Sequence, residues 1–282
     1  IPYERDFMGR SIAYGIISRR RGASIGVNLF PRVPACSFNC VYCFRGGAAI
    51  KTAEPIDDGT LDPGMLLGAL EEAYDDLPGA RAVDFSGNGE PTLHARFPEF
   101  VEAALGFARE RGLQVGVFTN STTLWREEVA RALERVDHVE AKLDAVDQRK
   151  FGLINEPVEG LRAGDVVSWL GDFRRKFGGT LAVQVMLLRY RGVVNYGEED
   201  ARAMAEALRI IEPDVVHLYT VYRTPRLRDA SRADEEAMMA FAEEIRRAGF
   251  KVEVYPRRPR PEPSSSATRR VGLPPMRVAR PT

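Results

Sequence analysis

The hydrophobic and polar residues of this chain form two alternating kinds of segment. Short apolar runs rich in β-branched and aromatic residues predict strands at residues 24–30, 82–85, 113–118, 138–143, 181–188 and 215–221. Between these runs, apolar residues recur three or four positions apart, which predicts helices. We expect helices from Asp62-Pro63 onward and over 97–111, 125–136, 164–176 and 201–211. A last helix ends at Gly249, and Ser231 and Asp234 are expected to form a capping box at its start. A final short strand is expected at 251–255.

The alternation of strands and helices predicts the fold class. Strands separated by helices of 10–15 residues form a parallel sheet with the helices outside it. Six such units fall short of the eight that close a (β/α)8 barrel. We therefore expect an α/β fold, a partial (β/α)6 barrel over residues 23–255, with an N-terminal arm at 1–22 and a basic tail rich in proline and arginine at 256–282.

All three cysteines of the chain lie within eight residues, in the segment Cys36-Ser-Phe-Asn-Cys40-Val-Tyr-Cys43. Thiolates are soft ligands for zinc, copper and iron–sulfur clusters. A disulfide framework would use an even number of cysteines spread along the chain. A structural zinc site would need a fourth ligand, and the three histidines, at positions 94, 138 and 217, lie far along the chain and not at the spacing of a zinc finger. The three cysteines therefore supply three corners of a tetrahedral or cubane metal site.

The C-x3-C-x2-C spacing, with Tyr42 before the last cysteine, resembles the signature of the radical S-adenosylmethionine (radical SAM) superfamily. The resemblance implies that Cys36, Cys40 and Cys43 each bind one iron of a [4Fe-4S] cluster and that the fourth iron binds SAM. It also implies that Tyr42 lies near the cluster and the adenine of SAM.

Two polar segments follow predicted strands, at the edge where parallel α/β folds bind ligands. They are Ser86-Gly87-Asn88-Gly89-Glu90-Pro91 and Thr119-Asn120-Ser121. The first could simply form a tight turn and the second a helix N-cap. The first also resembles the GGEP motif of radical SAM proteins, with Asn88 in place of the first glycine. The resemblance implies that its backbone binds the amino group of SAM, that Glu90 fixes the loop, and that the second segment reaches the methionine or ribose part of SAM.

Lys142 and Asp144, at the end of the fourth predicted strand, are two positions apart and lie on one face of it. Burial of two ions is costly unless they are paired, so they could form a structural ion pair. Alternatively, Asp144 contacts SAM and Lys142 acts on the substrate, because a desolvated lysine can form a Schiff base. Lys51 is a second candidate for that catalytic role. Gln184 and Met186, on the fifth predicted strand, complete the candidate cofactor-binding residues.

Further segments resemble the iron–sulfur oxidoreductase branch of the superfamily, close to the wyosine-synthesis (TYW1-like) enzymes. They include Val27-Asn-Leu29, Ala141-Lys-Leu-Asp-Ala145, Ile154-Asn155 and Val185-Met-Leu187. Those enzymes join a pyruvate fragment to a methylated guanosine of tRNA, with a second cluster and a catalytic lysine. This chain has no further cysteine for a second cluster, so the same ring closure is not expected.

The resemblance also implies the chemistry. An external one-electron donor, similar to a flavodoxin or ferredoxin, reduces the cluster; SAM is cleaved to methionine and a 5′-deoxyadenosyl radical, which takes a hydrogen atom from the substrate. Three functions stay open: modification of a base in RNA or tRNA, modification of a protein or peptide, as by a glycyl-radical activase, and a non-catalytic electron carrier. The polar residues at the strand ends favour an enzyme, since a carrier needs no SAM-binding rim.

The charge of the chain is unevenly distributed. Residues 256–282 hold seven arginines and one glutamate, so the tail carries +6 and the remainder −6. Such a tail attracts phosphate and favours an RNA partner, although it could equally be a solvated appendage. No apolar run reaches the ~18 residues of a membrane span, and no signal peptide is recognised. We expect a cytoplasmic monomer that does not bind membranes.

Overall fold

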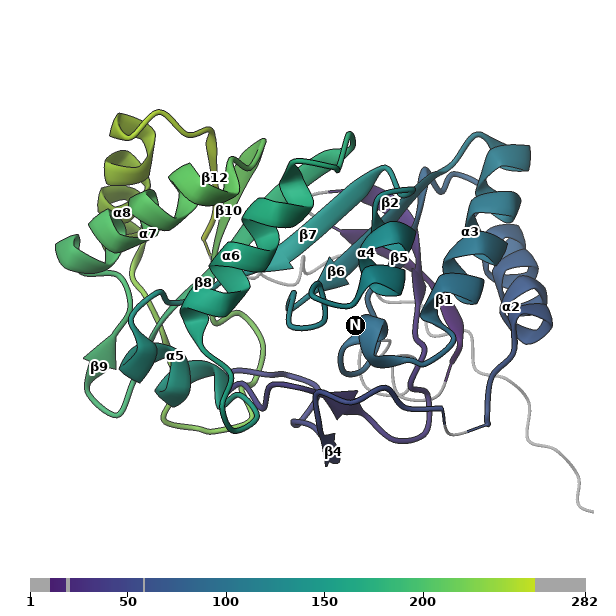
Figure 1. The fold of residues 1–282 in the computed structure, drawn as a ribbon, viewed down its shortest axis with the longest axis horizontal. Helices are drawn as coiled ribbons and strands as arrows, with labels where there is room; N and C mark the ends of the chain where they lie inside the picture. The colour runs from purple at the N-terminus through teal and green to yellow at the C-terminus, as the bar shows by residue number, and fades with distance from the viewer. Residues whose placement is uncertain (1–10, 19–20, 58, 257–282) are drawn as a thin grey trace, which may run out of the picture.

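The computed structural model describes residues 11–18, 21–57 and 59–256, and the fold is a curved, mostly parallel sheet with helices on one side (Figure 1). The strands follow one another in the order β1-β2-β5-β6-β7-β8-β10-β12. From β2 onward each is parallel to its neighbours. The parallel strands are β2 (Gly22–Val27), β5 (Ala82–Phe85), β6 (Gln114–Thr119), β7 (His138–Lys142), β8 (Thr180–Tyr190), β10 (Val215–Thr220) and β12 (Val252–Tyr255). The predicted fold class, a partial barrel of parallel strands, is confirmed.

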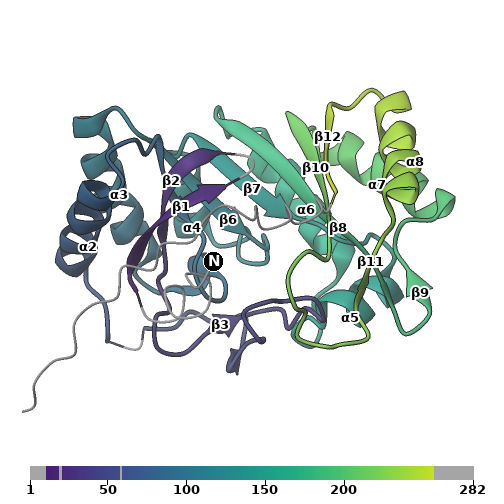
Figure 2. The same cartoon turned by 180° about the vertical axis from the view of Figure 1, so that it is seen from behind.

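Most of the helices pack on the convex face of this sheet, and the view from behind faces the strands (Figure 2). The helical elements are α2 (Pro63–Asp76), the 3-10 turn η1 (Pro91–Leu93), α3 (Phe97–Arg111), α4 (Glu127–Leu133), α5 (Gln148–Asn155), α6 (Ala163–Arg174), α7 (Glu198–Ile211) and α8 (Glu235–Arg247). The helix α5 lies at the lower edge, where Phe151 packs against Phe38 (Figure 1). Asp62 caps α2 as expected, accepting from the Met65 amide at 2.9 Å. Asp234, and not Ser231, caps α8. The short helix α5 was not predicted.

The N-terminal segment differs from the expectation of an arm. Within it, β1 (Ala13–Ser18) pairs antiparallel with β2 at the edge of the sheet. Tyr14 is buried, and its ring lies over Gly26, where a Cβ would come within 2.5 Å of it. Residues 1–10 and 19–20 of the predicted arm, and the predicted tail beyond Pro256, lie outside the described residues.

The two faces of the sheet differ in polarity because successive side chains of a strand point in opposite directions. One set, including Val83, Val117, Val139 and Val185, joins the hydrophobic core under the helices. The alternate set faces the inside of the barrel and is polar or charged in several strands; it includes Asp84, His138, Glu140, Lys142, Gln184 and His217. The interior of the barrel is therefore a polar lumen.

Three short strand pairs lie beside the main sheet. β3 (Ala35–Cys36) pairs with β4 (Ile50–Lys51), and β9 (Val193–Val194) and β11 (Ser231–Arg232) both pair with the long strand β8. β3 and β4 lie at the lower edge of the barrel in Figures 1 and 2, where the parallel strands end. No helix within the described ranges is both long and apolar enough to cross a bilayer.

Candidate functional site

The cysteines lie in the segment that follows β2, which we call the cysteine loop (residues 31–52). Its backbone is held by distant parts of the chain. The amides of Asn39 and Val41 donate to carbonyl oxygens of Asn155 and Ile154, at 2.9 and 3.0 Å. The loop thus depends on contacts more than 100 residues away in sequence.

The side chain of Arg226 holds the middle of the cysteine loop. Its guanidinium donates to the carbonyl oxygens of Asn39 (2.6 Å) and Cys40 (3.3 Å), and it forms an ion pair with Glu156 at 2.6 Å. A guanidinium has five donors in a fixed plane, so it can fix two carbonyls and one carboxylate at once. The path of the loop between Cys36 and Cys43 is set in this way.

Two asparagine side chains donate hydrogen bonds to cysteine sulfur atoms. The Nδ2 atom of Asn120 lies 3.5 Å from Cys36 Sγ, and that of Asn155 lies 3.4 Å from Cys40 Sγ. The backbone amide of Phe38 also donates to Cys36 Sγ, at 3.4 Å. Both asparagines are buried. Such donors favour the thiolate, the form that binds metal.

The surroundings nevertheless disfavour free thiolates. Burial raises the pKa of Cys40 to about 12, and the nearby Asp144 carboxylate adds to this. Burial, with a contribution from Glu90, raises the pKa of Cys36 well above its ordinary value. These thiols need positive charge to lose their protons, and iron supplies it.

The donor set fits an iron–sulfur cluster. The cysteines are partly buried, two of the three sulfur atoms accept amide hydrogen bonds, and thiolate is the usual ligand of iron in such clusters. Among the residues described, no three His, Cys, Asp or Glu side chains form a group that could hold a single metal ion.

The segment after β5 lies directly against the cysteine loop, and its glycines permit this. Gly89 has φ +69°, and a Cβ there would come within 1.9 Å of the carbonyl oxygen of Ala35, next to Cys36. At Gly87 a Cβ would come within 2.3 Å of Asn28. The amide of Glu90 donates to the Ala35 carbonyl at 2.8 Å. The glycines thus make a tight turn, as the simpler interpretation of the motif predicts, and the turn lies against the metal-binding loop.

Glu90 joins the two predicted SAM-binding segments. Its Oε1 atom accepts from the hydroxyls of Thr92 and Thr119, both at 2.7 Å, and its Oε2 atom accepts from the Asn120 amide at 2.6 Å. Burial raises the pKa of its carboxyl, although these donors act in the opposite direction. The geometry agrees with the expected role of Glu90 in fixing the loop.

Hydrogen bonds to other parts of the chain also fix Ser86 and Asn88, in the segment after β5. The amide of Asn88 donates to Asn28 Oδ1 at 2.8 Å, and the Oδ1 atom of Asn88 accepts from Arg45 at 3.1 Å. The carbonyl oxygen of Ser86 accepts from Tyr14 at 3.0 Å. β1, which the sequence pattern does not predict, therefore supports the segment after β5.

The segment Thr119-Asn120-Ser121 is not the N-cap of the next helix, because α4 begins only at Glu127. Ser121 has φ +68°, a conformation that is costly for a residue with a Cβ and that concentrates at functional sites. Its hydroxyl is buried and has no hydrogen-bond partner among the described residues. An unsatisfied buried hydroxyl fits a site that a polar ligand completes.

Asp144 is the centre of a hydrogen-bonded group at the end of β7. Its carboxylate accepts from the Tyr42 hydroxyl, from Asn155 Nδ2 at 2.6 Å and from the Met186 amide at 2.8 Å. Lys142 Nζ lies 3.5 Å from it and 5.2 Å from the centroid of the Tyr42 ring. The structural ion pair is therefore present, and protein donors occupy both carboxylate oxygens.

The two candidate lysines have different surroundings. Lys142 faces the lumen beside Gln184, its partner in the register of β7 and β8. Lys51 lies opposite Cys36 in the pairing of β3 with β4, but its side chain is exposed. Lys142 is thus largely shielded from solvent, and Lys51 is not. Met186 packs in a small hydrophobic cluster with Tyr42.

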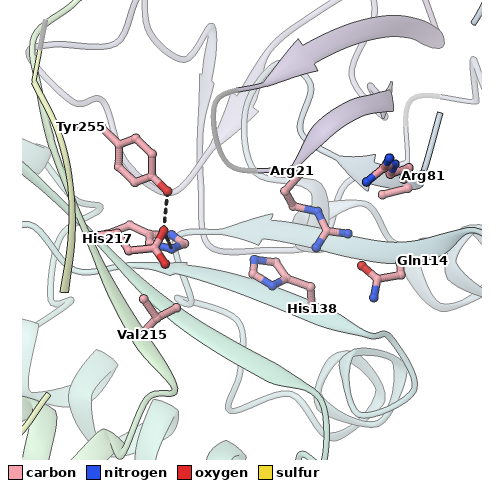
Figure 3. Close-up of a pocket in the computed structure, with 9 residues that line it drawn as sticks. Arg21, Arg81, Gln114, His138, Val215, His217 and Tyr255 are labelled. Carbon is pink, nitrogen blue, oxygen red and sulfur yellow. Dashed lines mark hydrogen bonds and ion pairs between the residues drawn. The ribbon is translucent and has the colours of Figure 1, made fainter. Parts of the chain in front are cut away.

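The polar group at the other end of the lumen is not predicted from the sequence. Glu140 accepts from His138 at 3.1 Å and from His217 at 2.9 Å, and these histidines line a cavity of about 300 Å³. Figure 3 shows Arg21, Arg81 and Gln114 on one side of it and Tyr255 with His217 on the other. The histidines stand alone in the sequence, so no local motif indicates this cavity.

Asn155 is a second residue that sequence reasoning missed. The segment Ile154-Asn155 belongs to those that carry the family resemblance, but its sequence alone does not assign Asn155 to the metal site. The structure does so through its contacts with Cys40 Sγ and the Asp144 carboxylate.

Comparison with known proteins agrees with this geometry. The sequence profile of the radical SAM superfamily matches residues 30–190, which include the cysteine loop and strands β5 to β8. The UPF0026 protein of Methanocaldococcus jannaschii is 32% identical over 218 residues, covering 76% of this chain and 65% of that protein. This chain thus matches slightly less than two thirds of the length of that relative.

Two solved structures share the fold at low sequence identity. A radical SAM methyltransferase from Sphaerobacter thermophilus has a TM-score of 0.62 and 14% identity, with 87% of this chain and 77% of that chain covered. Archaeal TYW1 has a TM-score of 0.51 and 15% identity, with 82% and 74% covered. The likeness to TYW1 therefore concerns the fold alone. The profile match over most of the barrel, together with the three partly buried cysteines, shows that this chain belongs to the radical SAM superfamily.

Proposed function

We propose that this radical SAM enzyme generates its radical at the carboxyl ends of the strands and uses it on a substrate held in the polar lumen. When bound, a [4Fe-4S] cluster would supply the one-electron reduction by which SAM is cleaved for hydrogen-atom abstraction from the substrate. The observation that carries the proposal is the pair of buried asparagine amides at the sulfur atoms of Cys36 and Cys40. Cys36, Cys40 and Cys43 would hold the cluster.

The residues around the cysteines position SAM and exclude water. Glu90 fixes Thr119 and the Asn120 amide, so the backbone of the Gly87–Gly89 turn has a defined place beside Cys36. The hydroxyl of Ser121 is available to a polar group of SAM. We assign Asp144 to positioning, because it holds Tyr42 and Asn155 against the cysteine loop.

Lys142 is our candidate for contact with the substrate. Its ammonium group lies in the lumen, between Asp144 and the Tyr42 ring. A cation there can hold a carboxylate or phosphate of the substrate, and, if it loses its proton, it can form a Schiff base with a carbonyl. Lys51 is not needed for either role.

The first test is the reductive cleavage of SAM itself. Anaerobic reconstitution with iron and sulfide, followed by dithionite and SAM, is expected to give 5′-deoxyadenosine that chromatography can quantify. Cys40→Ala removes one of three ligands and is expected to lower the product to the level without protein. Product that persists in Cys40→Ala, or a cluster whose EPR spectrum ignores SAM, would contradict the proposal and favour an electron carrier.

We propose RNA, in particular tRNA, as the substrate class. The +6 charge of residues 256–282 supports this, because basic side chains bind phosphate and release counterions. A protein or peptide is the alternative substrate, and the fold does not discriminate between the two: TYW1 shares the fold, but so does a structure of SuiB from Streptococcus suis bound to the precursor peptide SuiA, with a TM-score of 0.58.

Removal of residues 257–282 is expected to weaken tRNA binding. The slope of log affinity against log salt concentration should fall by roughly 0.7 for each arginine that contacts phosphate. Filter binding of labelled tRNA at several salt concentrations measures this, with a scrambled-order tail as the control for charge alone. Equal affinity and slope for the full and shortened chains would count against RNA contact by the tail.

A further inference from the structure

The proposed function needs one electron from outside for each cleavage of SAM, and the following inference rests on that function. We propose that an acidic one-electron carrier protein docks on the surface formed by Phe44, Arg45 and Arg223, which we call the Phe44 surface. Phe44 directly follows the cluster ligand Cys43 in the sequence. An electron that arrives there has only a short path to the cluster.

The Phe44 ring is an exposed aromatic side chain held between two cations. It is 45% exposed, with the guanidinium of Arg223 at 4.3 Å from its centroid and that of Arg45 at 4.9 Å. A large apolar ring that is exposed to water does not stabilise the isolated protein. Aromatic and arginine side chains are enriched at protein interfaces, where such a ring becomes buried.

Other exposed apolar residues belong to the same loop. Of the ten large hydrophobic side chains that are well exposed among the described residues, Val33, Phe44 and Ile50 come from the cysteine loop. A fourth, Tyr222, is adjacent in sequence to Arg223. Three of these ten exposed side chains thus come from the 22-residue loop that carries the cysteines.

The charge of this region is opposite to that of the body of the protein. Residues 31–52 contain Arg32, Arg45 and Lys51, residues 222–228 contain Arg223, Arg226 and Arg228, and neither segment contains an Asp or Glu. These two segments carry +6, whereas residues 1–255 as a whole carry −6. Glu156, in its ion pair with Arg226, offsets one of these positive charges. A basic area on an acidic body steers an acidic partner to one place.

RNA could use the same basic and aromatic residues, but the position favours a carrier. The substrate must reach the lumen near Lys142, whereas Phe44 is exposed and directly follows a cluster ligand in the sequence. Electron transfer between proteins slows steeply with distance, so the position next to Cys43 is useful to a carrier in a way that it is not to an RNA backbone.

The experiment compares two reductants on the reconstituted enzyme. The rate of 5′-deoxyadenosine formation is measured with a reduced, acidic [2Fe-2S] ferredoxin and, separately, with saturating dithionite. Arg223→Glu is expected to lower the ferredoxin-driven rate at low salt about tenfold or more and to leave the dithionite-driven rate within a factor of about two. Phe44→Ala, which keeps the charge, should lower the ferredoxin-driven rate as well. Arg209→Glu, on the exposed side of α7, is the matched charge control and should change neither rate.

Titration calorimetry with the oxidised ferredoxin gives a second readout that does not depend on turnover. Arg223→Glu should raise the Kd for the ferredoxin about tenfold, and higher salt should bring the Kd values of variant and wild type closer together. An unchanged Kd, or an equal rise in Arg209→Glu, would overturn the proposal. If Arg223→Glu lowers the ferredoxin-driven and the dithionite-driven rates equally, the Phe44 surface binds substrate or SAM and not a carrier. If wild type forms no product with dithionite, the proposed function fails, and the calorimetry still decides whether the carrier binds here.

Discussion

Replacement of Gly89 by alanine is expected to destabilise the protein by about 3 kcal/mol or more and to abolish cluster retention. The positive φ alone costs about 1–2 kcal/mol for a residue with a Cβ. In addition, the new methyl group would come within 1.9 Å of the Ala35 carbonyl oxygen, so either the turn or β3 must move. Because Cys36 follows Ala35, this movement displaces a cluster ligand. Denaturant unfolding measures the free energy, and the absorbance of the reconstituted protein measures the cluster.

Alanine substitutions at two other glycines distinguish the cost of the positive φ from the cost of the close approach to Ala35. Gly160 has φ +84°, and apart from its own and its two chain neighbours' atoms no described atom lies within 4 Å of the position that a Cβ would take. Gly160→Ala should therefore show the backbone cost alone and retain the cluster. Gly106 lies inside α3 with equally open space around its Cβ position in the described structure, and Gly106→Ala should stabilise the helix by about 0.5–1 kcal/mol. If Gly89→Ala loses no more stability than Gly160→Ala, the close approach to Ala35 does not matter.

Replacement of Asp144 by alanine is the other change with a large expected effect. It leaves the Tyr42 hydroxyl, the Asn155 amide group and the Met186 amide without their acceptor, and it leaves the Lys142 ammonium group without its carboxylate. Removal of one partner of a buried ion pair costs about 3–5 kcal/mol. We expect a loss of that size in the free energy of unfolding, together with loss of SAM cleavage, since Asn155 and Tyr42 are no longer held against the cysteine loop.

An exposed ion pair serves as the control for Asp144. Glu127 pairs with Arg131 one turn later on α4, and their side chains are 73% and 71% exposed. Glu127→Gln should change the free energy of unfolding by less than about 0.5 kcal/mol and leave SAM cleavage intact. A loss in Asp144→Ala no greater than in this control would show that the network around Asp144 is not structural.

The parallel strands could be predicted because each is an apolar run of the right length, bounded by turn residues. The strand β1 was missed because arginines flank its short apolar run on both sides, which suggested a solvated arm. Its place in the sheet depends on the pairing with β2, where the Tyr14 ring lies over Gly26. The helix α5 was missed because it is only 8 residues long; Asp147 caps it.

The candidate site was predicted where its residues form local motifs. The cysteine spacing and the glycine turn can be read directly, and the structure brings Glu90 and Asn120 together as neighbours of that turn. The contact of Asn155 with Cys40 joins residues 115 positions apart, which no local pattern indicates. The same holds for Glu140, whose partner His217 lies 77 positions away. That Lys51 is exposed also depends on the path of the loop in space.

Because distant residues anchor the cysteine loop, the chain must fold before a cluster can be inserted. All three cysteines leave the ribosome early, but the carbonyls of Ile154 and Asn155 that hold the loop come more than 100 residues later, and Arg226 later still. A nascent chain therefore carries the complete set of thiols long before it has a place to keep a cluster. Iron and sulfide delivered during synthesis would meet a loop without its shape, so productive cluster insertion must follow the folding of the second half of the barrel.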